Sequence, residues 1–129
     1  MPINLIALIV LVFFCISGIY AAGCDFNKLS SFAKQRYGDT AYKDVLELEQ
    51  LINQLKTAPE AEKLKKVNDF FNQKIEYAED IDLWGQSDYW ATPLEAIGRQ
   101  AGDCEDYSLA KYVFLKLLNV PNDKLRLTY

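Results

Sequence analysis

The sequence contains no histidine among its 129 residues, so the chain offers no imidazole as a base or as a metal ligand. No other side chain readily takes over the role of the base at neutral pH, because Asp and Glu are too acidic and Lys and Tyr too basic unless strongly shifted. Cysteine is scarce, with three residues, and a zinc site of about four Cys or His ligands is therefore excluded. Clusters of basic residues are also missing. Together with a net charge of −4, their absence argues against a nucleic-acid partner.

Charged side chains are absent from residues 1–23, and residues 5–20 form an almost continuous apolar run. This pattern is typical of a secretory signal peptide with small residues, Ala21 and Gly23, at the cleavage point. A retained N-terminal membrane anchor is the alternative, because the run is about long enough to span a bilayer. The segment Ala21-Ala22-Gly23-Cys24 also resembles a weak bacterial lipoprotein box, which would lipidate Cys24. Each alternative predicts an exported protein whose single folded domain begins at Cys24.

Apolar spacing and helix-end signals divide the rest of the chain mainly into helices. We expect helices over residues 25–37, 39–57, 59–74, 93–97 and 103–118, a loop with a short strand over residues 76–89, and a strand over residues 125–129. The third helix should bury Leu64, Val67, Phe70 and Phe71. The fifth helix is nearly apolar from Tyr107 onward, so we expect it to be the central helix of the core, buried on most sides.

Cys104 follows Gly102 and Asp103 at the first turn of this helix. A helix N-terminus lowers the pKa of a thiol, whereas the carboxylates of Asp103, Glu105 and Asp106 would raise it by repulsion. A hard cation that binds carboxylate oxygens would remove the repulsion, and calcium has that chemistry. Two alternatives stay open for Cys104: a small buried apolar residue, or a disulfide with Cys24 in an oxidising compartment.

Four segments of the sequence resemble the bacterial transglutaminase-like cysteine proteinases, and the match covers roughly residues 64–129. The segments are Trp84-Gly85, Asp88-Tyr89-Trp90-Ala91-Thr92-Pro93-Leu94-Glu95, Gly102-Asp103-Cys104-Glu105-Asp106-Tyr107-Ser108-Leu109-Ala110-Lys111-Tyr112 and Leu125-Arg126-Leu127-Thr128-Tyr129. The resemblance implies an α+β, papain-like/transglutaminase-like cysteine protease fold with a Cys-His-Asp triad in that chain order. It further implies that Cys104 is the nucleophile and that Asp103 and Glu105 are calcium ligands, with Asp106 a weaker candidate for the same ion.

The same resemblance implies a periplasmic protease that depends on Ca²⁺ and cleaves the N-terminal region of a large surface adhesin to control biofilm attachment. Members of this family are held in check by an inner-membrane receptor that senses cyclic di-GMP. The His and Asp of the triad would follow residue 129. We therefore interpret residues 24–129 as the N-terminal portion of the protease domain, inactive by itself.

A different class of function stays open beside the protease. Trp84, Tyr89 and Trp90 lie close together in the sequence, and they either line a cleft or close one end of the core. The chain would then be a catalytically dead exported module that binds calcium or a protein partner through these aromatic residues.

Overall fold

The computed structural model describes residues 24–127. The expected signal peptide or membrane anchor of residues 1–23 lies outside the described residues, as do residues 128–129. In chain order the elements are α2 (Phe26–Tyr37), α3 (Asp39–Leu55), α4 (Glu60–Lys74), β1 (Glu76–Tyr77), α5 (Asp80–Trp84), α6 (Pro93–Arg99), β2 (Ala101–Gly102), α7 (Cys104–Leu117) and the 3-10 helix η2 (Asn122–Lys124). Within residues 24–127 we find no helix with the length and apolar character needed to cross a membrane.

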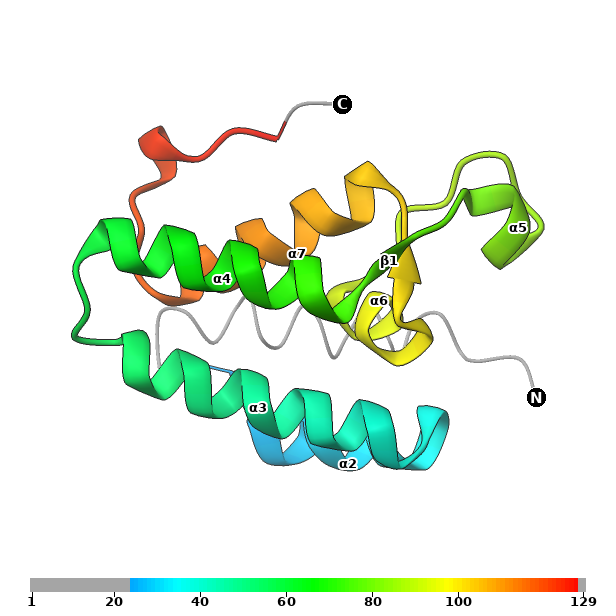
Figure 1. The fold of residues 1–129 in the computed structure, drawn as a ribbon, viewed down its shortest axis with the longest axis horizontal. Helices are drawn as coiled ribbons and strands as arrows, with labels where there is room; N and C mark the ends of the chain where they lie inside the picture. Colours follow the sequence, from blue (N-terminus) through cyan, green and yellow to red (C-terminus); the bar gives the residue numbers. More distant parts are fainter. Residues whose placement is uncertain (1–23, 128–129) are drawn as a thin grey trace.

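The helices form two antiparallel pairs, with the short helix α6 between them (Figure 1). α2 and α3 lie along one side of the molecule, and α4 and α7 lie opposite. Gly38 makes the tight turn between α2 and α3 with a φ of 99°, which glycine adopts without strain. All five helices expected from the sequence are present, and their observed ends lie within a few residues of the expected ones.

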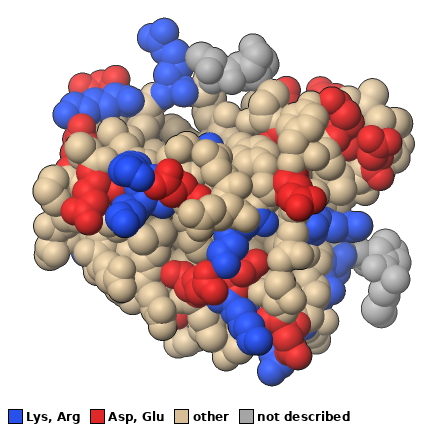
Figure 2. Space-filling model, viewed as in Figure 1, with Lys and Arg blue, Asp and Glu red and all other residues tan. Residues whose placement is uncertain are grey.

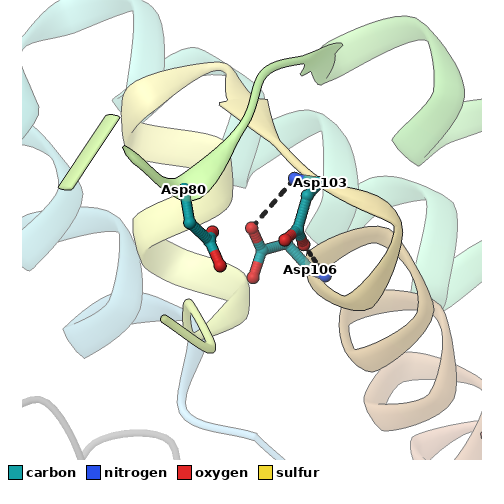
Figure 3. Close-up of side chains that lie close together, drawn as sticks. All are labelled: Asp80, Asp103 and Asp106. Carbon is teal, nitrogen blue, oxygen red and sulfur yellow. Dashed lines mark hydrogen bonds between the residues drawn. The ribbon is translucent and has the colours of Figure 1, made fainter. Parts of the chain in front are cut away.

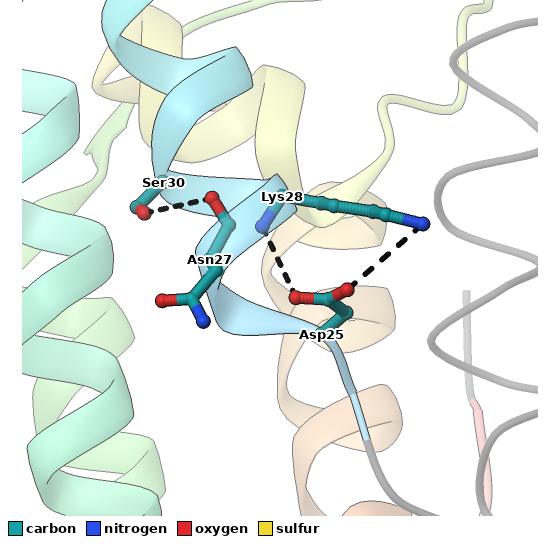
Figure 4. A network of polar contacts seen from close by, with 4 residues as sticks. All are labelled: Asp25, Asn27, Lys28 and Ser30. Carbon is teal, nitrogen blue, oxygen red and sulfur yellow. Dashed lines mark hydrogen bonds and ion pairs between the residues drawn. The ribbon is translucent and has the colours of Figure 1, made fainter.

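Local hydrogen bonds explain where the first helix begins. Asp25 is the N-cap of α2, and its Oδ1 accepts from the backbone N–H of Lys28 at 3.2 Å. Figure 4 shows this cap together with the Lys28–Asp25 ion pair at 4.0 Å and the hydrogen bond that the Ser30 hydroxyl donates to the Asn27 carbonyl. The cap satisfies one of the backbone donors that every helix N-terminus leaves unpaired.

The core lies between the two helix pairs and is largely the one that the apolar spacing predicts. Val67, Phe70 and Phe71 of α4 are buried, and the Phe71 ring packs against Phe114 of α7 with centroids 5.6 Å apart. The prediction is wrong for Leu64, which is 39% exposed. It lies one turn from the N-terminus of α4, and the other helices leave it largely open to solvent.

α7 is central to the fold and is enclosed on most sides, as the sequence predicts. Asp106, Ala110, Val113 and Phe114 are buried along one stripe of the helix, and Leu115 is buried on another side. Tyr107, Leu109 and Leu117 are only partly buried against the core. Every residue from 105 to 117 is buried or half-buried, so the prediction of burial on most sides is confirmed for this helix.

A small parallel sheet places α5 beside the start of α7. β1 pairs with β2 in the register Glu76↔Ala101 and Tyr77↔Gly102, and the N–H of Ala78 donates to the Gly102 carbonyl at 2.9 Å. The expected short strand within residues 76–89 is therefore confirmed, whereas helix α5 was not expected. The expected strand over residues 125–129 is not formed in its described part, residues 125–127.

Candidate active site

Cys104 is the first residue of α7, and its thiol is free and exposed. The two alternatives that would have silenced it, burial as an apolar residue and a disulfide with Cys24, are therefore wrong. A reciprocal capping box fixes the backbone on both sides of the cysteine. Asp103 Oδ1 accepts from the N–H of Glu105 at 3.1 Å and of Asp106 at 3.2 Å, and Asp106 Oδ2 accepts from the N–H of Asp103 at 3.0 Å. The thiol thus stands on a rigid helix start next to the positive end of the helix dipole.

Asp106 is buried, with 1% of its surface exposed. Its second oxygen, Oδ1, accepts from the N–H of Ala91 at 2.8 Å, so the carboxylate ties α7 to the segment that precedes α6. Burial raises the pKa of Asp106 to about 6; the backbone donors of Asp103 and Ala91 partly oppose the rise, and the charges of Asp103 and Asp80 add to it. A Cβ added at Gly102 would lie 2.8 Å from the Asp106 Cβ. The glycine before the motif is therefore required for this close packing.

Asp80, at the start of α5, also points toward this group (Figure 3). It is 4% exposed, and its Oδ2 accepts from the N–H of Tyr89 at 2.7 Å. Its Oδ1 is buried without a hydrogen-bond partner. Burial raises the pKa of Asp80, and the neighbouring carboxylates of Asp103 and Asp88 raise it further.

The carboxylates form two adjoining groups that share Asp80. Oxygens of Asp80, Asp103 and Asp106 lie within 4.8 Å of one another, and so do oxygens of Asp80, Asp88 and Glu105. Glu105 Oε2 is a second buried oxygen without a hydrogen-bond partner, and burial followed by the charges of Asp103, Asp88 and Asp80 raises the pKa of Glu105. Within residues 24–127 no Lys or Arg forms an ion pair with any of these five carboxylates.

These observations fit a calcium ion. Calcium binds six to eight oxygen ligands in flexible geometry, and two buried oxygens here have no hydrogen-bond donor. Asp103 and Glu105, the ligands expected from the sequence, fall in different groups, and Asp80 joins the groups. Both oxygens of Asp106 already accept backbone hydrogen bonds, which accords with its weaker candidacy. The sequence offered no spacing signal for Asp80, because the fold brings it to the motif from another helix.

The three aromatic residues near the site differ in how tightly they pack against their neighbours. The Trp84 ring stacks on Tyr89 with centroids 4.4 Å apart, and the Arg99 guanidinium lies 4.9 Å from the Trp84 centroid. The Tyr89 hydroxyl donates to Glu95 Oε2 at 2.6 Å, and burial together with this bond raises the pKa of Tyr89. Trp90 is 41% exposed. Trp84 and Tyr89 therefore form a packed cluster, whereas Trp90 presents much of its ring to solvent.

An exposed thiol at the first turn of a central helix, with a polar cluster beside it, is the arrangement used by enzymes with a cysteine nucleophile. The chain belongs to the family of bacterial transglutaminase-like cysteine proteinases, whose family model matches residues 24–129. No curated protein matches the chain.

Solved structures of Legionella pneumophila LapG share the fold. The EGTA-treated form is 39% identical, with a TM-score of 0.62 over 76% of this chain and 52% of that chain. The calcium-bound form is 40% identical, with a TM-score of 0.61 over 76% of this chain and 53% of that chain. The chain thus spans about half the length of these relatives, and what it shares with them is mainly helical, with little sheet.

Proposed function

We propose that this chain is the cysteine-bearing and calcium-binding part of a periplasmic protease that cleaves a large surface adhesin and thereby controls biofilm attachment. One observation carries the proposal: the free, exposed Cys104 is fixed by a double cap between carboxylates that have unpartnered buried oxygens. Membership of the proteinase family supports the reaction class. The adhesin as substrate, and an inner-membrane receptor that senses cyclic di-GMP as partner, are carried over from the sequence resemblance.

In the proposed reaction the Cys104 thiolate attacks the carbonyl carbon of a peptide bond. The C–N bond then breaks, which leaves a thioester on Cys104 and an amine that takes up the proton lost by the thiol. Water cleaves the thioester, so the sulfur regains a proton and a carboxylic acid is released. Both proton transfers need an imidazole, and residues 1–129 contain no histidine. We propose that the part of the domain present in the relatives but not spanned by this chain supplies it.

Calcium would be held by Asp103 and Glu105 together with the carboxylates grouped around them. The bound ion supplies positive charge that compensates these carboxylates next to the thiolate. Support comes from the calcium-bound form of LapG, a relative that is 40% identical and matches 76% of this chain. Export to the periplasm rests on the charge-free residues 1–23, by cleavage of a signal peptide, by a retained anchor or by lipidation at Cys24.

The reactivity of the thiol tests the enzymatic proposal. The full chain is treated with iodoacetamide at neutral pH in the presence of calcium, and mass spectrometry locates and times the modification. We expect Cys104 to be labelled faster than free cysteine, because the helix N-terminus favours the thiolate. The Cys104→Ser variant is the control, since it lacks this thiol and any labelling that remains in it does not come from Cys104.

Labelling of Cys104 no faster than free cysteine would favour the second candidate, a catalytically dead module that binds calcium or a protein partner. The exposure of Trp90, at 41%, and of Tyr77, at 62%, supports that candidate. Tyr77 lies close to the start of α7, because it pairs with Gly102 in the register of β1 and β2.

A further inference from the structure

Two arginines from different helices meet at one hollow in the surface of the protein. Arg36 lies in the last turn of α2, and Arg99 lies in the last turn of α6. Together with Gln35 and Tyr37 they line a basic hollow of about 510 Å³. Figure 2 shows acidic side chains gathered at the α5 end of the molecule and basic side chains next to them. Positive charge is thus concentrated locally in a chain whose net charge is −4.

A close contact between α2 and α6 brings the two arginines together. A Cβ added at Gly98 would lie 2.3 Å from Cδ2 of the Tyr37 ring, so the ring rests on the helix at a glycine. Arg99 follows this glycine in the sequence, and Arg36 precedes the tyrosine. Burial raises the pKa of Tyr37, and the neighbouring Arg36 and Arg99 both oppose the rise. Both guanidinium groups therefore lie near the same hydroxyl.

Aromatic rings hold the two guanidinium groups in place. The Arg99 guanidinium lies 4.9 Å from the centroid of the Trp84 ring, and the Arg36 guanidinium lies 5.6 Å from the centroid of the Tyr37 ring. A guanidinium that stacks on a ring keeps the N–H groups along its edge for another partner, and the ring restricts its movement. The donors of the basic hollow are therefore ordered before a ligand arrives.

No carboxylate among residues 24–127 forms an ion pair with Arg36 or Arg99. Glu95 is the buried carboxylate nearby, but its oxygens already accept from the Tyr89 hydroxyl and from the N–H of Thr92. Two like charges that lie side by side repel each other. An anion in the hollow would remove this repulsion and accept charge-assisted hydrogen bonds.

Contacts join the basic hollow to the candidate active site. Arg99 lies on Trp84, whose ring stacks on Tyr89 with centroids 4.4 Å apart. The N–H of Ala91, two residues after Tyr89, donates to α7, the helix that begins with Cys104. An extended peptide spans about 3.3 Å per residue. A substrate held at Cys104 can therefore place a residue farther along its chain in the hollow.

We propose that the basic hollow binds the carboxylates of an acidic segment of the protein substrate. The identity of the partner as a substrate rests on the proposed protease function. Gln35, Arg36 and Arg99 are exposed, so a side chain of another protein can reach the hollow. Bound there, such a segment would hold the substrate at a point away from the bond that is cleaved.

The position of the hollow favours carboxylates over phosphate groups or a membrane. Phosphate sites are typical of helix N-termini, whereas this hollow lies at the C-terminal ends of α2 and α6. The negative end of a helix dipole disfavours an anion with two charges more than an anion with one. An anionic membrane surface attracts clusters of about four to eight basic residues, and this hollow has two.

Fluorescence anisotropy tests the inference with a fluorescein-labelled hexaglutamate peptide, and a hexaglutamine peptide with the same label is the neutral counterpart. We expect the full chain to bind hexaglutamate and not hexaglutamine. Arg36→Gln and Arg99→Gln should each weaken binding roughly tenfold, the usual effect of losing one charge-assisted hydrogen bond. Arg126→Gln is the matched control and should bind as wild type, because the third arginine is exposed and lies outside the hollow.

Absence of binding to hexaglutamate, or equal weakening in all three variants, would overturn the inference. Two further titrations of wild type test other anions. Tighter binding of inorganic phosphate than of the peptide would overturn the inference in favour of a small anion, and binding to phosphatidylglycerol vesicles without binding to the peptide would overturn it in favour of a membrane.

A further variant separates binding from folding. Arg99→Lys keeps the charge but not the planar fork of donors, so it should bind hexaglutamate more tightly than Arg99→Gln and more weakly than wild type. Far-ultraviolet circular dichroism and melting temperature should match wild type in every arginine variant. Weakening that appears only together with a lowered melting temperature would overturn a binding role for these side chains.

Peptide binding is measured without catalysis, so its result is independent of the reactivity of Cys104. Binding of hexaglutamate together with slow labelling of Cys104 would overturn the protease and support the basic hollow as a docking site for an acidic protein. Fast labelling of Cys104 without peptide binding would overturn the inference and leave the proposed function intact.

Discussion

Asp103 combines two tasks that a carboxylate can perform at once. Its Oδ1 accepts the N–H groups of Glu105 and Asp106 and so caps α7, while the side chain also belongs to a carboxylate group suited to a cation. An N-cap is worth about 1 kcal/mol when it is replaced by alanine. Any variant of Asp103 must therefore separate the loss of the cap from the loss of the ion.

We predict that calcium raises the melting temperature of the full chain, and that Asp103→Ala with Glu105→Ala abolishes the rise. The physical reason is that an ion bound only by the folded state stabilises it by about 2.7 kcal/mol at a hundredfold excess over its Kd. Differential scanning calorimetry with calcium or with EGTA makes the measurement. Asp103→Asn with Glu105→Gln is the comparison pair, because asparagine still caps the helix.

In this second pair the melting temperature in EGTA should lie closer to that of wild type, while the response to calcium is again lost. Glu62→Ala with Asp82→Ala, two exposed carboxylates outside both groups, should leave the calcium response intact. A rise in melting temperature that survives in both Asp103–Glu105 pairs would contradict the assignment of these two ligands.

Only some of the residues at the site could be predicted from the sequence. The position of Cys104 follows from local signals, because Gly102 and Asp103 mark a helix start and the cap fixes the next residue as its first turn. The role of Asp80 could not be predicted in this way. It reaches the motif through the pairing of Tyr77 with Gly102, and sequence spacing carries no information on which strand lies beside which.

At the scale of the helices, α6 packs closely against α2 at a glycine. A Cβ added at Gly98 of α6 would lie 2.3 Å from Cδ2 of the Tyr37 ring. The ring occupies the space where every other residue type carries a side chain. Glycine is thus required at this position by packing, although it lies within a helix, where it costs about 1 kcal/mol relative to alanine.

We predict that Gly98→Ala destabilises the fold by roughly 1–2 kcal/mol, because overpacking of about 1–3 kcal/mol outweighs the gain in helix propensity. Urea unfolding measures the change. In a Tyr37→Ala background the space is free, so the same substitution should be neutral or stabilising, and a double-mutant cycle gives the coupling between the two positions. An equal loss in both backgrounds would show that the contact with Tyr37 is not the cause.

The prediction of a strand at the end of the chain failed because an alternating pattern of residues does not show whether another strand lies beside it. Leu125 and Leu127 alternate with a polar residue, and Leu125 has an extended backbone with φ −116° and ψ 130°. No strand among residues 24–127 pairs with this segment, so it is not part of a sheet. α5 was missed for another reason: five residues are too few to show a helical apolar period. The local signals were limited to the acidic residues Asp80 and Asp82 in its first turn and to Gly85 at its end.

At the scale of the whole molecule, α4 and α7 connect the core to the site. Phe71 of α4 is fully buried. The centroid of its ring lies 5.2 Å from that of Phe70 and 5.6 Å from that of Phe114 in α7. α7 begins with Cys104, and its buried stripe rests on this aromatic contact. The stability of the core therefore sets how firmly the base of the thiol-bearing helix is held.

We predict that Phe71→Ala costs about 3–5 kcal/mol of unfolding free energy, the usual range for a fully buried phenylalanine. Leu64→Ala is the matched control on the same helix. Its loss of unfolding free energy should be much smaller than that of Phe71→Ala, because Leu64 is 39% exposed. Urea unfolding should show a large decrease in midpoint with an unchanged slope for Phe71→Ala, since the surface exposed on unfolding stays nearly the same. Equal losses for the two variants would contradict the packing of α4, and with it the support that α4 gives to the helix of Cys104.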